Sequence, residues 1–176
     1  MSVFEKTEYI INDDNSVRYV LGKYSKDPLV VFGINPSTAD SEKNDTTISI
    51  VEHIAELRNK DGYIMLNLYP QRATHIKKEY PHFADEEICK QNLLHISRVI
   101  SDDSDIIAAW GTHIKDRKYF VEMLEHIHNI VVSKNAKWVC LAKTKKGHPH
   151  HPTRLAYDKM TFDSFDMCKY IEKMKK

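Results

Sequence analysis

Four short apolar runs alternate with amphipathic helical segments, and this alternation constrains the fold more than any other feature of the chain. The runs are residues 29–34, 63–68, 106–110 and 138–141. Their almost continuous apolar character is typical of strands that are buried on both faces. The intervening helical segments are residues 45–59, 86–100 and 115–128. Strands separated by helices predict right-handed parallel crossovers, and therefore an α/β fold: a three-layer α/β/α sandwich around a four-stranded parallel sheet.

Further elements are predicted at both ends of this alternating region. The β-rich runs 9–11 and 17–24 flank the turn cluster 12–15, which predicts an N-terminal β-hairpin on an edge of the sheet or covering one. Residues 162–174 are expected to form a closing helix. The apolar positions expected to face inward in two of the helices are Ile48, Val51, Ile54, Ala55, Leu57, Ile88, Leu93, Leu94, Ile96 and Ile100.

Length and composition favour one globular domain over residues 1–176. The chain has 176 residues, 41% hydrophobic and 29% charged, and contains no internal repeat or linker-like stretch. No apolar run approaches the roughly 20 residues that span a bilayer, so no membrane partner is expected. The charged first twenty residues lack the apolar core of a secretory signal, and an odd number of cysteines, 3, argues for reduced thiols. These features predict a cytoplasmic protein.

Polar segments directly follow all four predicted strands. They are residues 35–40, 67–70, 110–113 and 147–152. Ligands of open α/β sheets bind beyond the carboxyl ends of the strands, so these segments are expected to converge on one site. Each segment also has an ordinary explanation on its own, since Asn-Pro-Ser starts many turns and Trp110 can belong to the core.

Several of these segments resemble the motifs of the uracil-DNA glycosylase superfamily, most closely its mismatch-specific branch. The resembling stretches are Gly33-Ile34-Asn35-Pro36-Ser37, Met65-Leu66-Asn67, Ala109-Trp110-Gly111 and His151-Pro152-Thr153. A closer resemblance, over residues 18–158, is to domain-of-unknown-function family 1643, an uncharacterised bacterial and phage family. Its signatures resemble Asn35-Pro36-Ser37-Thr38-Ala39-Asp40, Asp45-Thr46-Thr47-Ile48, Asn67-Leu68 with Arg72-Ala73-Thr74, Ala109-Trp110-Gly111 and Gly147-His148-Pro149-His150-His151-Pro152.

The resemblance implies roles for individual residues. Asn35 is expected to hold a water molecule, and Asn67 to read the edge of a base. His151 or His150 can donate to a departing base, and Asp40 or Asp45 can supply the carboxylate that Asn35 lacks. Asp45 is equally placed to cap a helix. Further expected ligand contacts are Ser37, Thr38, Tyr69, Arg72 and Trp110, although Tyr69 is also a candidate for the core.

The segment 134–159 is strongly basic, with seven Lys and Arg residues against one Asp, although the whole chain has a formal net charge of only +1. It is expected to bind phosphate through Lys143, Lys145, Lys146 and Arg154, or else to be a solvated loop. No metal site is expected from the nearby His148, His150 and His151, because no paired-cysteine or zincin motif accompanies them. Three cysteines cannot hold an iron–sulfur cluster, so no cofactor is expected.

Two functions follow from these features. The first is hydrolysis of the N-glycosidic bond of a normal or modified base in a nucleotide or nucleic acid. The alternative is a non-catalytic protein that binds a base, a nucleotide or a nucleic-acid end in the same pocket. The near-neutral net charge favours a nucleobase, a nucleotide or a single strand over an extended duplex as partner. The sequence predicts no oligomeric state.

Overall fold

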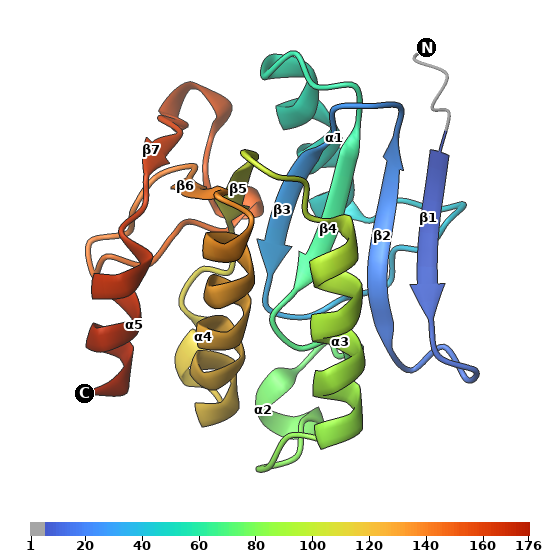
Figure 1. The fold of residues 1–176 in the computed structure, drawn as a ribbon, viewed down its shortest axis with the longest axis vertical. Coiled ribbons are helices and arrows are strands. Elements are labelled where there is room, and N and C mark those ends of the chain that lie inside the picture. Colours follow the sequence, from blue (N-terminus) through green and yellow to red (C-terminus); the bar gives the residue numbers. More distant parts are fainter. Residues whose placement is uncertain (1–5) are drawn as a thin grey trace.

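The computed structural model describes residues 6–176. Its centre is a seven-stranded mixed sheet (Figure 1). The strands lie in the order β1-β2-β4-β3-β5-β6-β7. Their bounds are β1 (Lys6–Ile11), β2 (Arg18–Tyr24), β3 (Leu29–Gly33), β4 (Tyr63–Asn67), β5 (Asp105–Ala108), β6 (Lys137–Cys140) and β7 (Asp163–Ser164). Strands β4, β3, β5 and β6 pair in parallel, so the predicted four-stranded parallel sheet is confirmed.

Antiparallel strands extend this parallel core at both edges. The predicted hairpin is formed by β1 and β2, and β2 joins the sheet by pairing antiparallel with β4. At the other edge, β7 pairs antiparallel with β6 through Val139–Ser164 and Cys140–Asp163. The prediction that the closing helix starts at 162 is therefore wrong at its N-terminal end. Residues 163–164 belong to the sheet, and the Asp166 side chain caps the helix by accepting from the Lys169 backbone N–H.

Five α-helices occur within residues 6–176. They are α1 (Thr46–Leu57), α2 (Ile76–Glu79), α3 (Glu86–Val99), α4 (Lys118–Ser133) and α5 (Met167–Lys175). Asp45 and Asp85 begin α1 and α3, and each carboxylate accepts the backbone N–H three residues further on at 3.0 Å. Helix α4 begins later than predicted because residues 113–115 form a 3₁₀ turn, and it extends to Ser133. None of the helices in the described part of the chain has the length and apolar character needed to cross a membrane.

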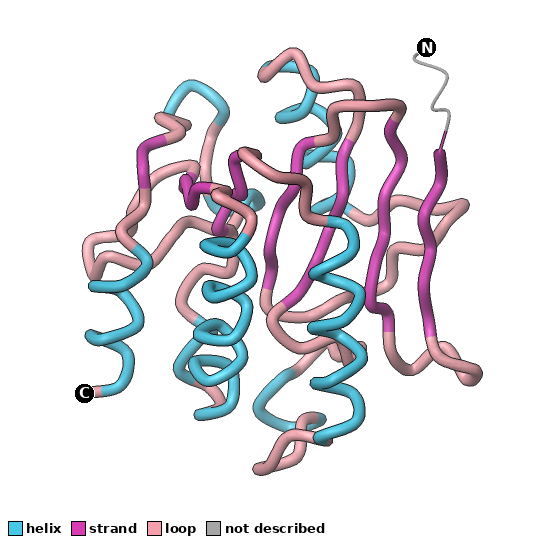
Figure 2. The backbone as a smooth tube through the Cα atoms, in the orientation of Figure 1, coloured by secondary structure: helices cyan, strands magenta, loops and turns pink. Residues whose placement is uncertain are grey.

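Helices pack on both faces of the sheet, with α3, α4 and α5 on one face and α1 on the other (Figures 1 and 2). On the first face Phe32 packs in one cluster with Ile96 and Phe120. On the second, Val31 packs in another with Val51. Most of the predicted inward positions are confirmed as buried or partly buried.

Leu57 and Leu94 were expected to face inward, and this prediction is wrong. Their exposed fractions are 52% and 43%. Leu94 lies two residues after the buried Asn92, and two helical residues are about 200° apart around the axis, so Leu94 points away from the sheet. Leu57 is two residues beyond the buried Ala55 and faces outward for the same reason.

The strand order reverses between β3 and β5. From β3 the chain passes through α1 to β4 on one side, and β5 then lies on the other side of β3 and leads on to β6. The connections after β3 and β5 therefore diverge, which leaves a crevice outside their carboxyl ends. This switch point is where a ligand site is expected in an open α/β sheet.

Candidate functional site

A pocket of about 200 Å³, here called the inner pocket, lies at the switch point. Its walls come from segments far apart in the sequence: the end of β3, the start of α1, residues 73–76, the segment after β5, and His151. Of the four polar segments predicted to converge, those after β3, β5 and β6 contribute to it. The segment 67–70 after β4 does not, and residues 73, 74 and 76 line the pocket instead.

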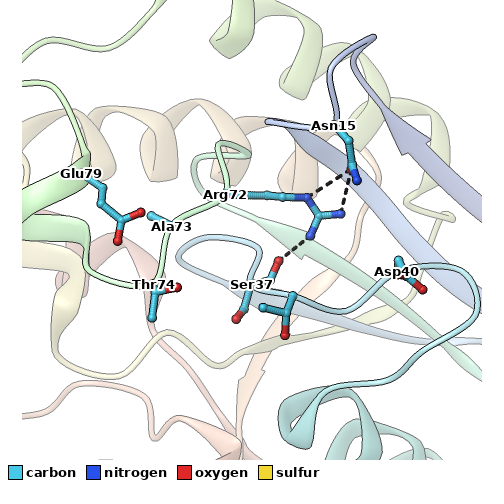
Figure 3. A pocket seen from close by; sticks show the side chains of 8 residues that line it. Asn15, Ser37, Asp40, Arg72, Ala73, Thr74 and Glu79 are labelled. Atoms are coloured by element: carbon cyan, nitrogen blue, oxygen red, sulfur yellow. Dashed lines mark hydrogen bonds between the residues drawn. The ribbon is translucent and has the colours of Figure 1, made fainter.

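A second pocket of about 330 Å³, here called the outer pocket, adjoins the first (Figure 3). Ser37, Ala73 and Thr74 line both pockets. The other residues around the outer pocket are Asn15, Thr38, Asp40, Arg72 and Glu79. The predicted ligand contacts Ser37, Thr38 and Arg72 are therefore brought together, and Ser37 stands where the two pockets meet.

Asn35 presents a fixed hydrogen-bond acceptor to the inner pocket. Its Nδ2 donates to the Ala73 carbonyl at 2.7 Å and to the Pro36 carbonyl at 3.1 Å. Two carbonyl partners determine which end of the amide is nitrogen. Within the described residues Oδ1 has no hydrogen-bond donor, and the side chain lines the pocket. Asn35 can therefore accept a hydrogen bond from a water molecule or a ligand without giving up its own anchoring.

His151 presents a donor to the same pocket. Its Nδ1 accepts from the Thr153 hydroxyl at 2.8 Å and from the Thr153 backbone N–H at 3.3 Å. Burial lowers the pKa of His151, and the charge of Arg154 and the nearby His113 lower it further. The imidazole is thus neutral at pH 7, and because Nδ1 is the acceptor, Nε2 carries the proton.

Arg18 lines the inner pocket with an exposed fraction of only 2%. Its Nη1 donates to the Ala39 carbonyl at 2.7 Å. Its Nε is buried and has no partner, and no carboxylate of the described residues lies within 4.0 Å of it. Burial lowers the Arg18 pKa to about 10, with a smaller contribution from the positive charge of Arg72, so the group is still protonated at pH 7.

The two candidate carboxylates lie in different pockets. Asp45 lines the inner pocket, but its Oδ1 accepts the Ile48 N–H as the cap of α1. Asp40 lines the outer pocket, where its Oδ1 accepts from the backbone N–H groups of Glu42 and Lys43, both at 2.8 Å. These backbone hydrogen bonds lower the Asp40 pKa, so Asp40 is an ionised turn-stabilising group. The inner pocket holds Asn35 and His151 without Asp40.

A family model described as "Protein of unknown function (DUF1643)" matches residues 18–153. The chain belongs to this family. The match contains every residue of the inner pocket, from Arg18 to His151. No curated protein and no solved structure matches this DUF1643 chain significantly, so the resemblance to uracil-DNA glycosylases stays a prediction.

Two residues of the DUF1643 chain that were predicted to contact ligand lie inside the protein, outside both pockets. Asn67 is 1% exposed, and neither atom of its side-chain amide has a partner within the described residues. It lies beside Gly33, where an added Cβ would approach Asn67 Oδ1 at 3.1 Å. Tyr69 is fully buried among Tyr80, Tyr119 and Phe120, and its hydroxyl accepts from the Asp85 N–H at 3.1 Å. Tyr69 is thus placed in the core, the alternative that the sequence left open.

Trp110 lines the inner pocket, but its indole N–H is already used. It donates to the Tyr170 hydroxyl at 3.1 Å, and that hydroxyl lies 2.8 Å from Nδ1 of the buried His148. Since the hydroxyl accepts from Trp110, its own proton can go to His148, whose pKa is lowered by burial. This chain of hydrogen bonds joins the end of β5, helix α5 and the segment 142–151.

Replacing Tyr170 should show how much these hydrogen bonds contribute to the stability of the protein. Tyr170→Phe leaves the buried Trp110 N–H and His148 Nδ1 without partners, so we expect the free energy of unfolding to fall by about 1–3 kcal/mol. Denaturant unfolding would measure it. Tyr157→Phe removes a hydroxyl from a tyrosine that is 44% exposed and should change the same quantity little. If both substitutions changed the free energy of unfolding equally, the hydrogen bonds of Tyr170 would have no specific role in stability.

The predicted phosphate-binding residues of the basic segment lie outside both pockets. Lys143 stands over the Phe165 ring at 5.7 Å, and the Lys146 carbonyl accepts from Lys173 Nζ at 2.7 Å. Lys145, His150 and Arg154 also do not line either pocket, although Arg154 lowers the pKa of His151. Phosphate binding by these residues stays a prediction. Residues 6–176 contain no group of three or more His, Cys, Asp or Glu side chains that could hold a metal ion.

Several residues of the inner pocket were given no individual role by the sequence, although His113 belongs to the predicted segment 110–113. They are Arg18, Thr47, Thr74 and His113. A signal for Arg18 exists in the sequence, because it is the one charged residue in the run Val17-Arg18-Tyr19-Val20-Leu21. A charge inside a buried strand is costly and is retained for a reason. His113 approaches the pocket while its Nδ1 lies 2.6 Å from Asp116.

Proposed function

We propose that this protein hydrolyses the N-glycosidic bond of a normal or modified nucleobase in a nucleotide or a single-stranded nucleic acid. One observation carries the proposal: Asn35 and His151 line a single pocket at the switch point, and their hydrogen bonds to the protein leave Asn35 Oδ1 as a free acceptor and His151 Nε2–H as a free donor. The strand order and the helices on both faces also support a three-layer sandwich of the uracil-DNA glycosylase kind.

The chemistry assigns one task to each residue. Breaking the bond leaves positive charge on the sugar and negative charge on the base. Asn35 Oδ1 accepts a hydrogen bond from water and orients its oxygen toward the sugar carbon. His151 Nε2–H donates to the base, where the electron pair of the broken bond arrives. The water forms the new C–O bond and loses a proton, and the released base gains one, so the reaction is balanced.

The size of the two pockets suits such a ligand. The inner pocket, about 200 Å³, is smaller than the roughly 300–1,000 Å³ of typical small-molecule sites. The adjoining outer pocket adds about 330 Å³ and is lined by hydroxyl groups of Ser37, Thr38 and Thr74. Together they offer room for a nucleotide, with polar groups for its sugar.

The test is release of free base, followed by chromatography. The panel consists of nucleosides, nucleoside monophosphates and single-stranded oligonucleotides with normal and modified bases. We expect base release from at least one substrate, and release at least about a hundredfold slower from His151→Ala purified in parallel, which controls for a contaminating hydrolase. Equal release by both preparations, or no release by the wild type, would overturn the proposal.

A non-catalytic binder is the second candidate, and one observation favours it. The one carboxylate that lines the inner pocket, Asp45, is engaged through Oδ1 as the cap of α1, and Asp40 is held in its own turn in the outer pocket, so neither is dedicated to activating water. A binder needs no such group. Calorimetric titration with the same panel separates the two candidates, since a binder retains a ligand that it never cleaves.

A further inference from the structure

The wall between the two pockets is built around two arginines that hold no carboxylate. The carbonyl of Ala39 accepts from both, from Arg18 Nη1 at 2.7 Å and from Arg72 Nη1 at 3.3 Å. Arg18 lines the inner pocket and Arg72 the outer pocket. Within residues 6–176, no ion pair within 4.0 Å includes either guanidinium.

Arg72 is held by neutral groups alone. Its guanidinium donates to the Ser37 carbonyl and to Asn15 Oδ1 at 3.0 and 3.3 Å (Figure 3). It also donates to the Tyr9 hydroxyl at 2.9 Å. These partners fix the position of the group, and the Asp40 carboxylate interacts with its charge only from a distance, without forming an ion pair. The positive charge therefore extends along the wall from the inner to the outer pocket.

Arg18 has a donor edge without hydrogen-bond partners within the described residues. Nη1 is used by Ala39, whereas Nε is buried without a partner and Nη2 has no hydrogen bond within the described residues. Nε–H and Nη2–H point the same way, and this pair is the edge from which arginine binds an oxyanion with two parallel hydrogen bonds. A buried cation with an empty donor edge beside a cavity lacks the anion that would stabilise it.

Asp45 is the one acidic side chain that lines the inner pocket, and it does not fill this role. Its charge favours protonated Arg18 from a distance, but its Oδ1 accepts the Ile48 N–H and no ion pair forms. The outer pocket contains Asp40 and Glu79 as well. Asp40 Oδ1 is bound by its own turn, and a Glu79 oxygen accepts from the His75 backbone N–H at 2.6 Å.

We propose that the ligand of this site carries a phosphate group, and that Arg18 binds it side-on through Nε and Nη2, supported by the charge of Arg72. The inference rests on the proposed function for the base and the sugar, but the phosphate site itself does not require hydrolysis. A phosphate site would mean that the natural ligand is a nucleotide or a nucleic-acid strand, and not a free base or a nucleoside.

The experiment is calorimetric titration of the whole protein with nucleosides, the matching 5′-monophosphates, short single-stranded oligonucleotides and inorganic phosphate. We expect the monophosphate or the oligonucleotide to bind at least about tenfold more tightly than the nucleoside, with a difference that shrinks as salt is added. The two phosphate-bearing arms show whether the phosphate belongs to a mononucleotide or to a strand.

Matched variants locate the effect. Arg18→Lys keeps the charge and removes the two-pronged edge, and Arg72→Gln removes the supporting charge. Both should weaken binding of the phosphate-bearing ligand several-fold and leave nucleoside binding unchanged. The control is Arg98→Gln, at an exposed arginine near residues 25, 26, 28 and 64 at the opposite end of the parallel strands. It should leave the binding of every ligand unchanged.

The outcomes separate this inference from the proposed hydrolysis. The phosphate site is overturned if the wild type binds nucleoside and monophosphate with equal affinity. It is also overturned if the wild type binds none of the three ligands: nucleoside, monophosphate and oligonucleotide. Arginine-dependent binding of a monophosphate that is never cleaved retains the phosphate site and rejects hydrolysis. Circular dichroism shows whether Arg18→Lys is folded. If Arg18→Lys is not folded, two other measurements test the phosphate site: ligand binding by Arg72→Gln, and the melting temperature of the wild type with inorganic phosphate. A melting temperature that does not rise with phosphate overturns the site.

Discussion

His151→Ala is expected to lower the rate of base release by a factor of about 10² to 10³, the range found when a single donor to a developing anion is removed. The reason is that His151 lines the inner pocket, and because Thr153 occupies Nδ1, Nε2–H is the donor left for a ligand. Ligand affinity should change much less, because negative charge on the base develops mainly in the transition state. Steady-state kinetics on the best substrate of the panel would measure both quantities.

Conservative replacement and pH identify the role of His151 more closely. The amide nitrogen of Gln can donate from nearly the place of Nε2, so His151→Gln should recover part of the lost rate. Because the His151 pKa is lowered from about 6.5, the imidazole is neutral above that pH, and the wild-type rate should not depend on this group between pH 7 and 9. His126→Ala, at an exposed position of α4, is the control and should be fully active.

Two results would contradict this assignment. If the rate fell about tenfold per pH unit above pH 6.5, the imidazolium and not the neutral ring would be the donor. If His151→Ala and His126→Ala were equally active, the donor would have to be sought elsewhere in the inner pocket, where His113 is the other imidazole.

The strands and helices could be predicted because burial leaves a local signature. Runs such as 29–34 and 63–68 are apolar since both of their faces are covered, and Asp45 marks the start of the helix that it caps. Strand β7 could not be found this way. Its two residues, Asp163 and Ser164, are exposed, and they form a strand only because β6 offers its edge.

The position of the inner pocket could be predicted from the sequence, and its lining residues less well. The reversal of strand order follows from topology, so the segment after β3 was correctly assigned to the pocket, and Asn35 with it. Asn67 and Tyr69 were assigned by the same rule. Strand β4 lies on the far side of β3 from β5, so Met65 reaches the inner pocket whereas Asn67 and Tyr69 are buried beyond it, and the sequence does not tell on which side of β3 this strand lies. Arg18 was missed because it comes from β2, an antiparallel strand beside the parallel core, to which the rule does not apply.

Asn35→Ala is expected to lower base release by a factor of about 10² or more while leaving ligand affinity nearly unchanged. Asn35 holds its own position through Ala73 and Pro36, so its Oδ1 is free to orient the attacking water. Asp45→Asn should be mild, because Asn caps a helix about as well as Asp does. Asp40→Asn, first considered as a source of the missing carboxylate, should likewise be mild, since that carboxylate stabilises a turn of the outer pocket.

Loss of the Asn35 anchor could also disturb the loop, so the variant needs a measurement that separates the two effects. The comparison is Asn35→Ala with Asn129→Ala, an exposed position on α4, by unfolding, ligand affinity and rate. If Asn35 orients water, only the rate of the Asn35 variant falls by the full factor, and its affinity for the substrate persists. If affinity falls as much as the rate, Asn35 shapes the binding pocket. A rate that drops in Asp40→Asn but not in Asn35→Ala would transfer the water-holding role to the outer pocket.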